Sequence, residues 1–130
     1  MLKEVQNRAD VSHIVRTFYD KVRIEPDLGP IFNSVITNWK EHLEKLTDFW
    51  EVSLFGGKVY LGDPIAAHQT TDAKTGNVIS AFHFGIWLNL WYETIDAFYI
   101  GENADLLKHR ARRMHTFIMI AIHQGRTASQ

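Results

Sequence analysis

Apolar side chains recur every three or four residues along almost the whole of this 130-residue chain. This spacing is typical of helices that bury one face, and no stretch shows the sustained alternation that a strand would require. The sequence therefore predicts a single all-α domain over residues 1–130, with about four substantial helices and two short ones packed as a bundle or as crossed layers. The substantial helices are expected from an N-cap at Asp10 or Ser12 to Val22, from Ser34 or Trp39 to Phe55, from Val78 to Ile100, and from Asn103 to just before Gly125.

Prolines and glycines mark the ends of these helices. Residues 26–30 include two prolines and a glycine, which suit a tight corner that stops the first helix, with Ile31 and Phe32 on a short turn after it. The pair Gly56-Gly57 ends the second substantial helix. The pair Asp63-Pro64 is typical of an N-cap and a first turn, and it predicts a very short helix that carries His68.

The two helices nearest the C-terminus are expected to bury broad apolar faces. In the helix from Val78 to Ile100 we expect the buried residues to be Ile79, Phe82, Ile86, Trp87, Leu90, Thr94, Ile95 and Phe98. In the last helix we expect them to be Leu107, Ala111, Met114, Ile118, Ala121 and Ile122.

The charge and cysteine content exclude several classes of protein. Fourteen Lys and Arg residues against 15 Asp and Glu residues leave a net charge of −1, so we expect no bulk attraction to nucleic acid or to an anionic membrane. Four basic residues of the last helix are interpreted as its solvated face, with Arg110 on its flank: Lys108, Arg110, Arg112 and Arg113. There is no cysteine, which excludes disulfides and thiolate metal sites. With no apolar signal core and no run long enough to span a bilayer, we expect a cytoplasmic protein.

The spacing of the seven histidines excludes the usual helical zinc pair. No two histidines are three or four residues apart, which is the spacing that lets two imidazoles on one helix bind one ion. His115 and His123 share a face but are about 12 Å apart along the helix. The chain also lacks a G-x-S-x-G nucleophile elbow and a glycine-rich phosphate loop.

Four polar or amphipathic residues interrupt the predicted apolar faces: Tyr19, His42, His68 and Trp87. Each of them taken singly is explained as a core residue whose polar atom finds a partner, or as a partly exposed histidine. Taken together they suggest a flat, apolar, iron-bearing ligand, with one histidine as the iron ligand and the other side chains as hydrogen-bond donors on the opposite side. An aromatic content of 12% would suit the walls of such a site, and it would suit an ordinary core equally well.

Five segments carry a family resemblance, in the family's order and over most of the chain. The chain resembles the third group of the truncated haemoglobins in Phe18 to Arg23 (FYDKVR), Asp27 to Asn33 (DLGPIFN), Trp39 to Leu43 (WKEHL) followed by Phe49-Trp50, Tyr60 to Pro64 (YLGDP) with His68, and His83 to Leu90 (HFGIWLNL). The resemblance implies a globin-like two-over-two helical sandwich around a non-covalent haem b.

The resemblance also implies a role for individual residues. His68, four residues beyond Pro64, would be the proximal iron ligand, Tyr19 the main distal donor, His42 the distal-helix histidine and Trp87 a second distal donor. Further haem contacts are implied for four residues: Phe32 on the haem face, Leu46 and Trp50 on the distal wall, and Lys45 near a propionate. For Lys45 an unpaired surface lysine is the other interpretation.

These roles predict how the protein would handle dioxygen, nitric oxide or another diatomic gas. Donors at Tyr19 and Trp87 that together contribute about 3 kcal/mol would slow release roughly a hundredfold. Slow release favours redox detoxification, such as nitric oxide dioxygenation or peroxide reduction, with electrons from a separate reductase. The alternatives are a reversible oxygen carrier or store, a gas sensor, and a helical structural protein without haem.

Overall fold

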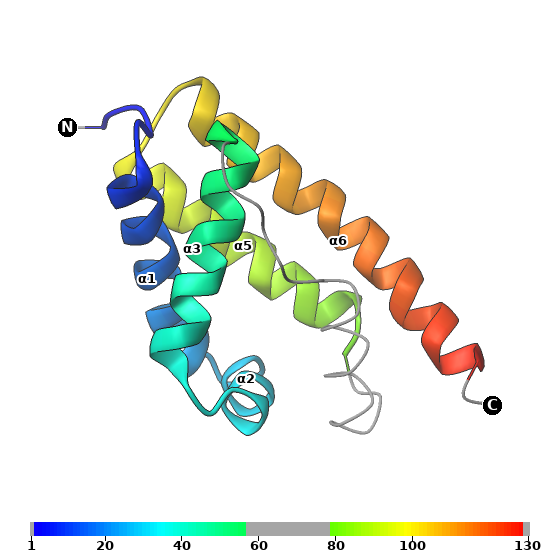
Figure 1. The fold of residues 1–130 in the computed structure, drawn as a ribbon. Coiled ribbons are helices and arrows are strands. Elements are labelled where there is room, and N and C mark those ends of the chain that lie inside the picture. The colour runs from blue at the N-terminus through cyan, green and yellow to red at the C-terminus, as the bar shows by residue number, and fades with distance from the viewer. Residues whose placement is uncertain (1, 57–78, 129–130) are drawn as a thin grey trace.

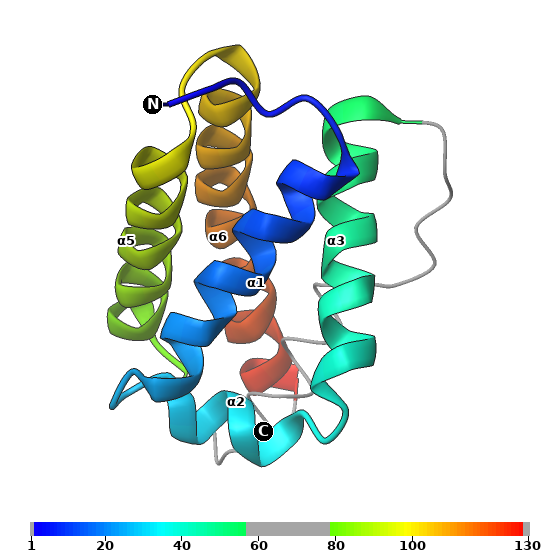
Figure 2. The same cartoon turned by 90° about the vertical axis from the view of Figure 1, so that its left-hand side faces the viewer.

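A computed structural model describes residues 2–56 and 79–128 and places them in five helices. These are α1 (Arg8–Ile24), α2 (Gly29–Val35), α3 (Trp39–Phe55), α5 (Ala81–Phe98) and α6 (Glu102–Ala128). Helix α1 runs antiparallel to α3 and α5 runs antiparallel to α6, and α1 crosses between α3 and α5 with α6 behind it (Figures 1 and 2). The prediction of an all-α fold with two helices packed over two is confirmed. The predicted short helix with His68 lies outside the described residues.

The prediction that Asp10 or Ser12 caps the first helix is wrong, because α1 begins one turn earlier. Its N-cap is Asn7, whose side-chain oxygen accepts a hydrogen bond from the backbone N–H of Asp10. Asp10 is instead buried in the first turn, where its carboxylate accepts from the backbone N–H of Gln6 (2.9 Å) and pairs with Lys3 (2.9 Å). The end of α1 before Pro26 agrees with the sequence.

The corner between α1 and α3 contains a helix where a short turn was expected. Pro30 lies at the start of α2, where its missing N–H costs nothing and its fixed φ suits a helix. Helix α3 then starts at Trp39, capped by the side chain of Asn38, which accepts from the backbone N–H of Glu41. It ends before Gly56, whose φ of 68° is the left-handed conformation that favours glycine after a helix.

The predicted buried face of α5 is partly wrong. Phe82 and Phe98 are 61% and 41% exposed, whereas Trp91, which the spacing did not assign to this face, is 1% exposed. The helix is apolar on nearly every side, so the spacing of its apolar residues does not determine which face is buried. Helix α6 also differs from the prediction, because it continues through Gly125 to Ala128.

The N-terminal segment closes one end of the helical sandwich. Lys3 forms an isolated parallel bridge with Tyr99, and Val5 is fully buried in the core. The carboxylate of Glu4 accepts hydrogen bonds from the backbone N–H groups of Asn103 (3.1 Å) and Ala104 (3.3 Å) at the start of α6. A negative charge at these unpaired N–H groups stabilises the first turn of a helix.

None of the helices in the described part of the chain combines the length and apolar character needed to cross a bilayer.

Gly101 should be intolerant of a side chain. Its φ is 119°, and a Cβ atom there would collide with the carboxylate of Glu4. We expect Gly101→Ala to lower the free energy of unfolding by about 1–3 kcal/mol, measured by urea titration. Gly85→Ala is the matched control, because a Cβ at this position inside α5 would meet no neighbouring residue within 4 Å and should gain up to about 1 kcal/mol. An equal response of the two variants would contradict this prediction.

Asp10 should make the free energy of unfolding depend on pH. Burial raises the pKa of its carboxyl, but hydrogen bonds from Lys3 and the Gln6 N–H outweigh burial and bring that pKa below its ordinary value. A lowered folded-state pKa stabilises the fold above the unfolded-state value, and this contribution is lost as pH falls through the folded-state pKa. We expect Asp10→Asn to cost about 1–2 kcal/mol at neutral pH.

The pH series supplies the test for Asp10. The stability difference between Asp10→Asn and the unaltered protein should shrink as pH falls below about 4, as followed by urea unfolding at each pH. Asp20→Asn, on the exposed side of the same helix, should show no such difference. A cost of Asp10→Asn that stayed constant down to low pH would contradict the prediction.

Candidate functional site

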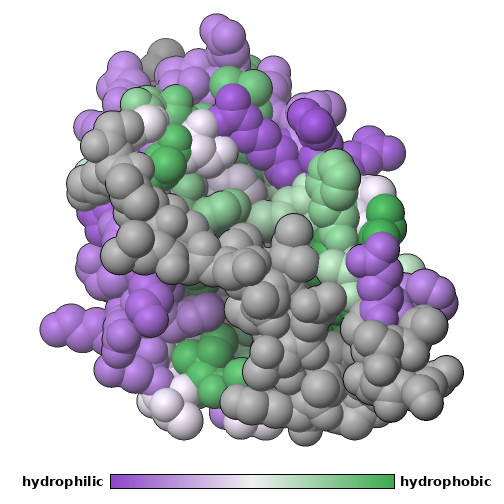
Figure 3. Space-filling view, turned by 45° about the vertical axis from the view of Figure 1, so that its right-hand side comes forward, coloured by the Kyte–Doolittle hydropathy of each residue, from purple (hydrophilic) through white to green (hydrophobic). Residues whose placement is uncertain are grey.

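A cavity of about 500 Å³ opens between α2, α3 and the first half of α5. This volume is in the range of sites that bind small molecules and cofactors. Figure 3 shows apolar residues exposed among hydrophilic ones on one side of the molecule. The residues that line the cavity are Tyr19, Leu28, Ile31, Phe32, Val35, Ile36, Thr37, Asn38, Glu41, His42, Lys45, Leu46, Ile79, His83, Phe84 and Trp87.

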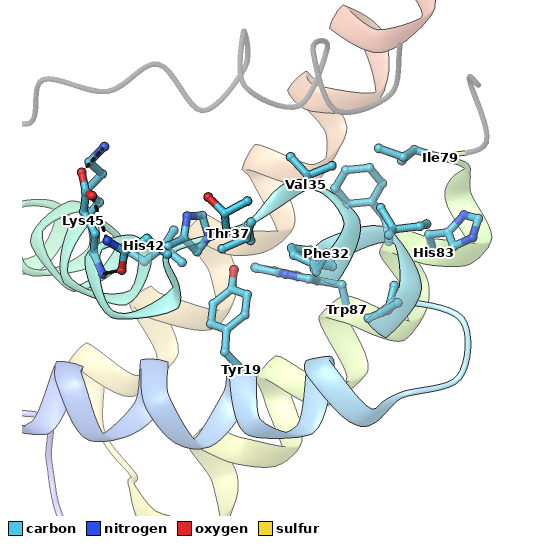
Figure 4. A pocket seen from close by; sticks show the side chains of 16 residues that line it. Tyr19, Phe32, Val35, Thr37, His42, Lys45, Ile79, His83 and Trp87 are labelled. Atoms are coloured by element: carbon cyan, nitrogen blue, oxygen red, sulfur yellow. Dashed lines mark hydrogen bonds and ion pairs between the residues drawn. The ribbon is translucent and has the colours of Figure 1, made fainter. Parts of the chain in front are cut away.

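Tyr19 supplies a hydroxyl at the polar end of this cavity. The side chain is 5% exposed and points from α1 into the cavity (Figure 4). Its ring meets the ring of His42 edge to face at 6.0 Å between centroids and the ring of Phe32 at 5.9 Å. On another side it meets Trp39 at 5.9 Å. Three aromatic neighbours therefore restrict the direction in which the hydroxyl points.

Trp87 brings an indole to the same region from α5 (Figure 4). Its ring packs edge to face on Phe18, with centroids 5.0 Å apart, and stacks on Trp91 at 5.6 Å with only 15° between the planes. Tyr19, His42 and Trp87, which the sequence proposes as polar groups of one site, therefore come together from three different helices.

The other haem contacts expected on α2 and α3 are divided between the cavity and the core. Phe32, Lys45 and Leu46 line the cavity. Trp50 does not belong to the described lining: it is 3% exposed and stacks on Trp91 at 4.9 Å. In the described part of the chain Trp50 therefore lies behind the cavity, and its expected place on the distal wall stays a prediction.

Lys45 lies at the edge of the cavity and is paired. Its ammonium Nζ lies 3.3 Å from Oε1 of Glu41, one turn earlier on α3. Both side chains are more than half exposed, and an exposed pair of this kind contributes little to stability. A negative group of a ligand at this edge would therefore compete with Glu41 for Lys45 at small cost.

His83 and Phe84 line the cavity at the start of α5, and neither is assigned a role by the sequence. The backbone N–H of Ser80 donates to Nδ1 of His83 (3.1 Å), so a neutral His83 carries its proton on Nε2. The spacing Ser80-x-x-His83 resembles that of a capping box, a signal that could have identified the contact. Nδ1 of His83 is thereby engaged as an acceptor, and this contact disfavours a metal bond at that nitrogen.

Phe84 forms a wall of the cavity that is supported from behind. The ring of His115, on α6, stacks on it at 4.8 Å with 12° between the planes. Burial lowers the pKa of His115, so this imidazole is neutral at pH 7 and packs as a flat, largely apolar plate.

The donor set and the walls of the cavity fit a flat apolar group with one polar end. Aromatic rings from α2 and α5 form the walls, and Tyr19 and His42 supply the polar end. The expected iron ligand, His68, lies outside the described residues, as does the segment Tyr60 to Pro64 before it.

The chain is similar to one protein family over nearly its whole length. A scan against models of known protein families finds no match. A curated relative, the group 3 truncated hemoglobin ctb of Campylobacter jejuni, is 34% identical over 124 residues, which cover 92% of this chain and 89% of the relative. The crystal structure of a group III truncated hemoglobin from Campylobacter jejuni superimposes with a TM-score of 0.76 at 34% identity, over 98% of this chain and 94% of that one.

Proposed function

Because the chain belongs to the group 3 truncated haemoglobins, a family that binds diatomic gases at a haem, we propose that it holds a non-covalent haem b in the 500 Å³ cavity. The observation that carries this proposal is a largely apolar cavity that Tyr19, His42 and Trp87 line together from three helices. We propose His68 as the proximal ligand of the iron. In this proposal Phe32 packs on the haem face, Leu46 lines the distal wall, and Lys45 serves a propionate.

The choice of His68 is supported by the bonding of the two histidines that line the cavity. His83 accepts a hydrogen bond at Nδ1, and a metal bond from Nε2 of the neutral ring would place a proton on Nδ1 and break this contact. His42 stands edge to face against Tyr19 at the polar end, which is the side proposed for the gas. A proximal ligand from the segment after Pro64 leaves both of these contacts intact.

A bound haem supplies the iron position at which a diatomic gas is held and reduced or oxidised. The chain's own residues determine how long the gas stays. The Tyr19 and Trp87 side chains both line this cavity, where we propose that the hydroxyl and the indole N–H donate to the gas, and His42 lines it beside them. Hydrogen bonds to a partly negative oxygen atom are stronger than bonds between neutral groups. The surrounding aromatic rings exclude water that would compete for these donors.

A protein that retains the gas for long is better suited to a reaction of the bound gas than to its transport. We propose redox detoxification, by nitric oxide dioxygenation or peroxide reduction, with a separate reductase as the electron source. Two donors on one small ligand support this proposal, because a carrier must release its cargo readily. Rapid dioxygen release by the unaltered protein, measured by stopped flow, would instead favour a reversible carrier or store.

Haem retention should depend on His68. Purified protein should show a Soret band and one iron per chain, and His68→Ala should lose stable haem because one iron–nitrogen bond anchors the group. Absorption spectra before and after gel filtration measure this retention. His109→Ala, on the exposed side of α6, is the matched control and should keep its haem. A colourless protein that ignores added haemin, or full retention by His68→Ala, would contradict the assignment.

Tyr19 should control the rate at which dioxygen leaves. Tyr19→Phe keeps the ring contacts and removes only the donor, so the dioxygen off-rate should rise by about one to two orders of magnitude. Stopped-flow displacement by carbon monoxide measures this rate. Tyr92→Phe is the matched control, because Tyr92 is half-buried on α5 and is not part of the cavity lining in the described chain. If both variants kept the off-rate of the unaltered protein, Tyr19 would not be a donor.

A further inference from the structure

Three indole rings form a continuous stack from the cavity into the core. Trp87 and Trp91 lie one turn apart on α5 with ring centroids 5.6 Å apart, and Trp50 of α3 stacks on Trp91 at 4.9 Å. Of these three, Trp87 lines the cavity and the other two are buried, with exposed fractions of 1% for Trp91 and 3% for Trp50. The ring behind Trp87 therefore belongs to a residue outside the described lining of the cavity.

Contacts with three other helices fix the orientation of Trp91. Its indole N–H donates a hydrogen bond of 3.2 Å to the backbone carbonyl of Leu107 on α6. The ring of Phe18 on α1 packs edge to face against it at 5.0 Å, and Trp50 covers the face turned toward α3. A directed hydrogen bond together with two ring contacts leaves one orientation for this indole.

Trp87 has less support of its own. Its ring is only partly buried, and within the described residues it stacks on Trp91 and meets Phe18 edge to face. Phe18 also packs on Trp91, so both supports of Trp87 depend on the position of Trp91. A rotation of Trp91 would move the plane against which Trp87 rests.

We propose that Trp91 is a positioning residue that orients the indole N–H of Trp87 toward the gas held beside Tyr19. This inference rests on the proposed function, in which Trp87 is a donor. The strength of a hydrogen bond falls steeply as its angle departs from linear. A buried residue that holds the angle of a donor therefore changes ligand release without touching the ligand.

The test is a double-mutant cycle on the dioxygen off-rate of the haem-loaded protein. Trp91→Phe keeps an aromatic ring but removes the bond to Leu107 and part of the stacking surface. The off-rate should rise about threefold to tenfold in Trp91→Phe. In the Trp87→Phe background the same substitution should change the off-rate by less than about twofold, because the donor that Trp91 orients is absent.

An NMR measurement reports the position of Trp87 directly. In the carbon monoxide form, the chemical shift of the Trp87 indole N–H depends on where that proton lies relative to the haem ring. Trp91→Phe should move this resonance. The control is Ile95→Val, because Ile95 is fully buried on the same helix about 12 Å from Trp87; it should leave both the resonance and the off-rate unchanged.

Each outcome bears on a different claim. An unchanged off-rate in Trp87→Phe alone overturns the donor role of Trp87, and with it the proposed function of that residue. A faster off-rate in Trp87→Phe with an unchanged rate and resonance in Trp91→Phe overturns the positioning role alone. An equal effect of Trp91→Phe with and without Trp87 also overturns it, because Trp91 would then act through the core in general.

A second variant covers the case in which Trp91→Phe does not fold. Trp50→Phe leaves Trp91 and its bond to Leu107 in place and weakens the contact on its other face. We expect a smaller rise in the off-rate, about twofold to threefold, which disappears in the Trp87→Phe background. No change in the off-rate of Trp50→Phe, together with an unmoved Trp87 resonance, would overturn the proposal.

Discussion

The rotation of α1 about its own axis is the constraint on which both the core and the cavity depend. Phe18 and Tyr19 are neighbours in sequence and point about 100° apart around the helix. Phe18 is fully buried against Trp87 and Trp91, while Tyr19 meets His42 and Phe32 at the cavity. A rotation that took the hydroxyl out of the cavity would also pull Phe18 from the indoles. The packing that stabilises the core therefore also orients the polar end of the site.

The sequence predicts the helices well where apolar residues are confined to one face, and poorly where they are not. In α1 the buried residues follow the expected stripe from Val11 to Val22. In α5 apolar residues lie on nearly all sides, so spacing alone misplaced Phe82 and omitted Trp91. The bounds of α2 were not predicted for another reason: it has only seven residues, too few for a spacing pattern, and the proline that indicated a corner also suits a first turn.

In the candidate site, too, some positions were predicted from the sequence and others depend on packing between helices. Tyr19, Phe32, His42, Lys45, Leu46 and Trp87 all line the cavity, and the family resemblance had proposed each of them. Trp50 was expected beside them, yet Trp50 and Trp91 form the stack behind the cavity. No local signal distinguishes a tryptophan that lines a cavity from one that supports its wall, because the difference depends on contacts between distant helices. The capping-box spacing of Ser80 and His83 indicates the contact of His83 with the Ser80 N–H, whereas the place of His83 in the cavity lining depends on the fold.

A diatomic gas has almost no shape by which a protein can recognise it, so discrimination depends on the direction of a few polar groups. In this chain the three candidates come from α1, α3 and α5, and small shifts between these helices would misalign their donors. The aromatic contacts behind the cavity oppose such shifts. Phe18 joins α1 to α5, Trp50 joins α3 to α5, and the bond from Trp91 to Leu107 joins α5 to α6. Close-packed rings transmit displacement instead of absorbing it. The order of the polar groups in the cavity therefore depends on the aromatic core behind it. Substitutions in that core should disturb these groups even where the substituted side chain does not line the cavity.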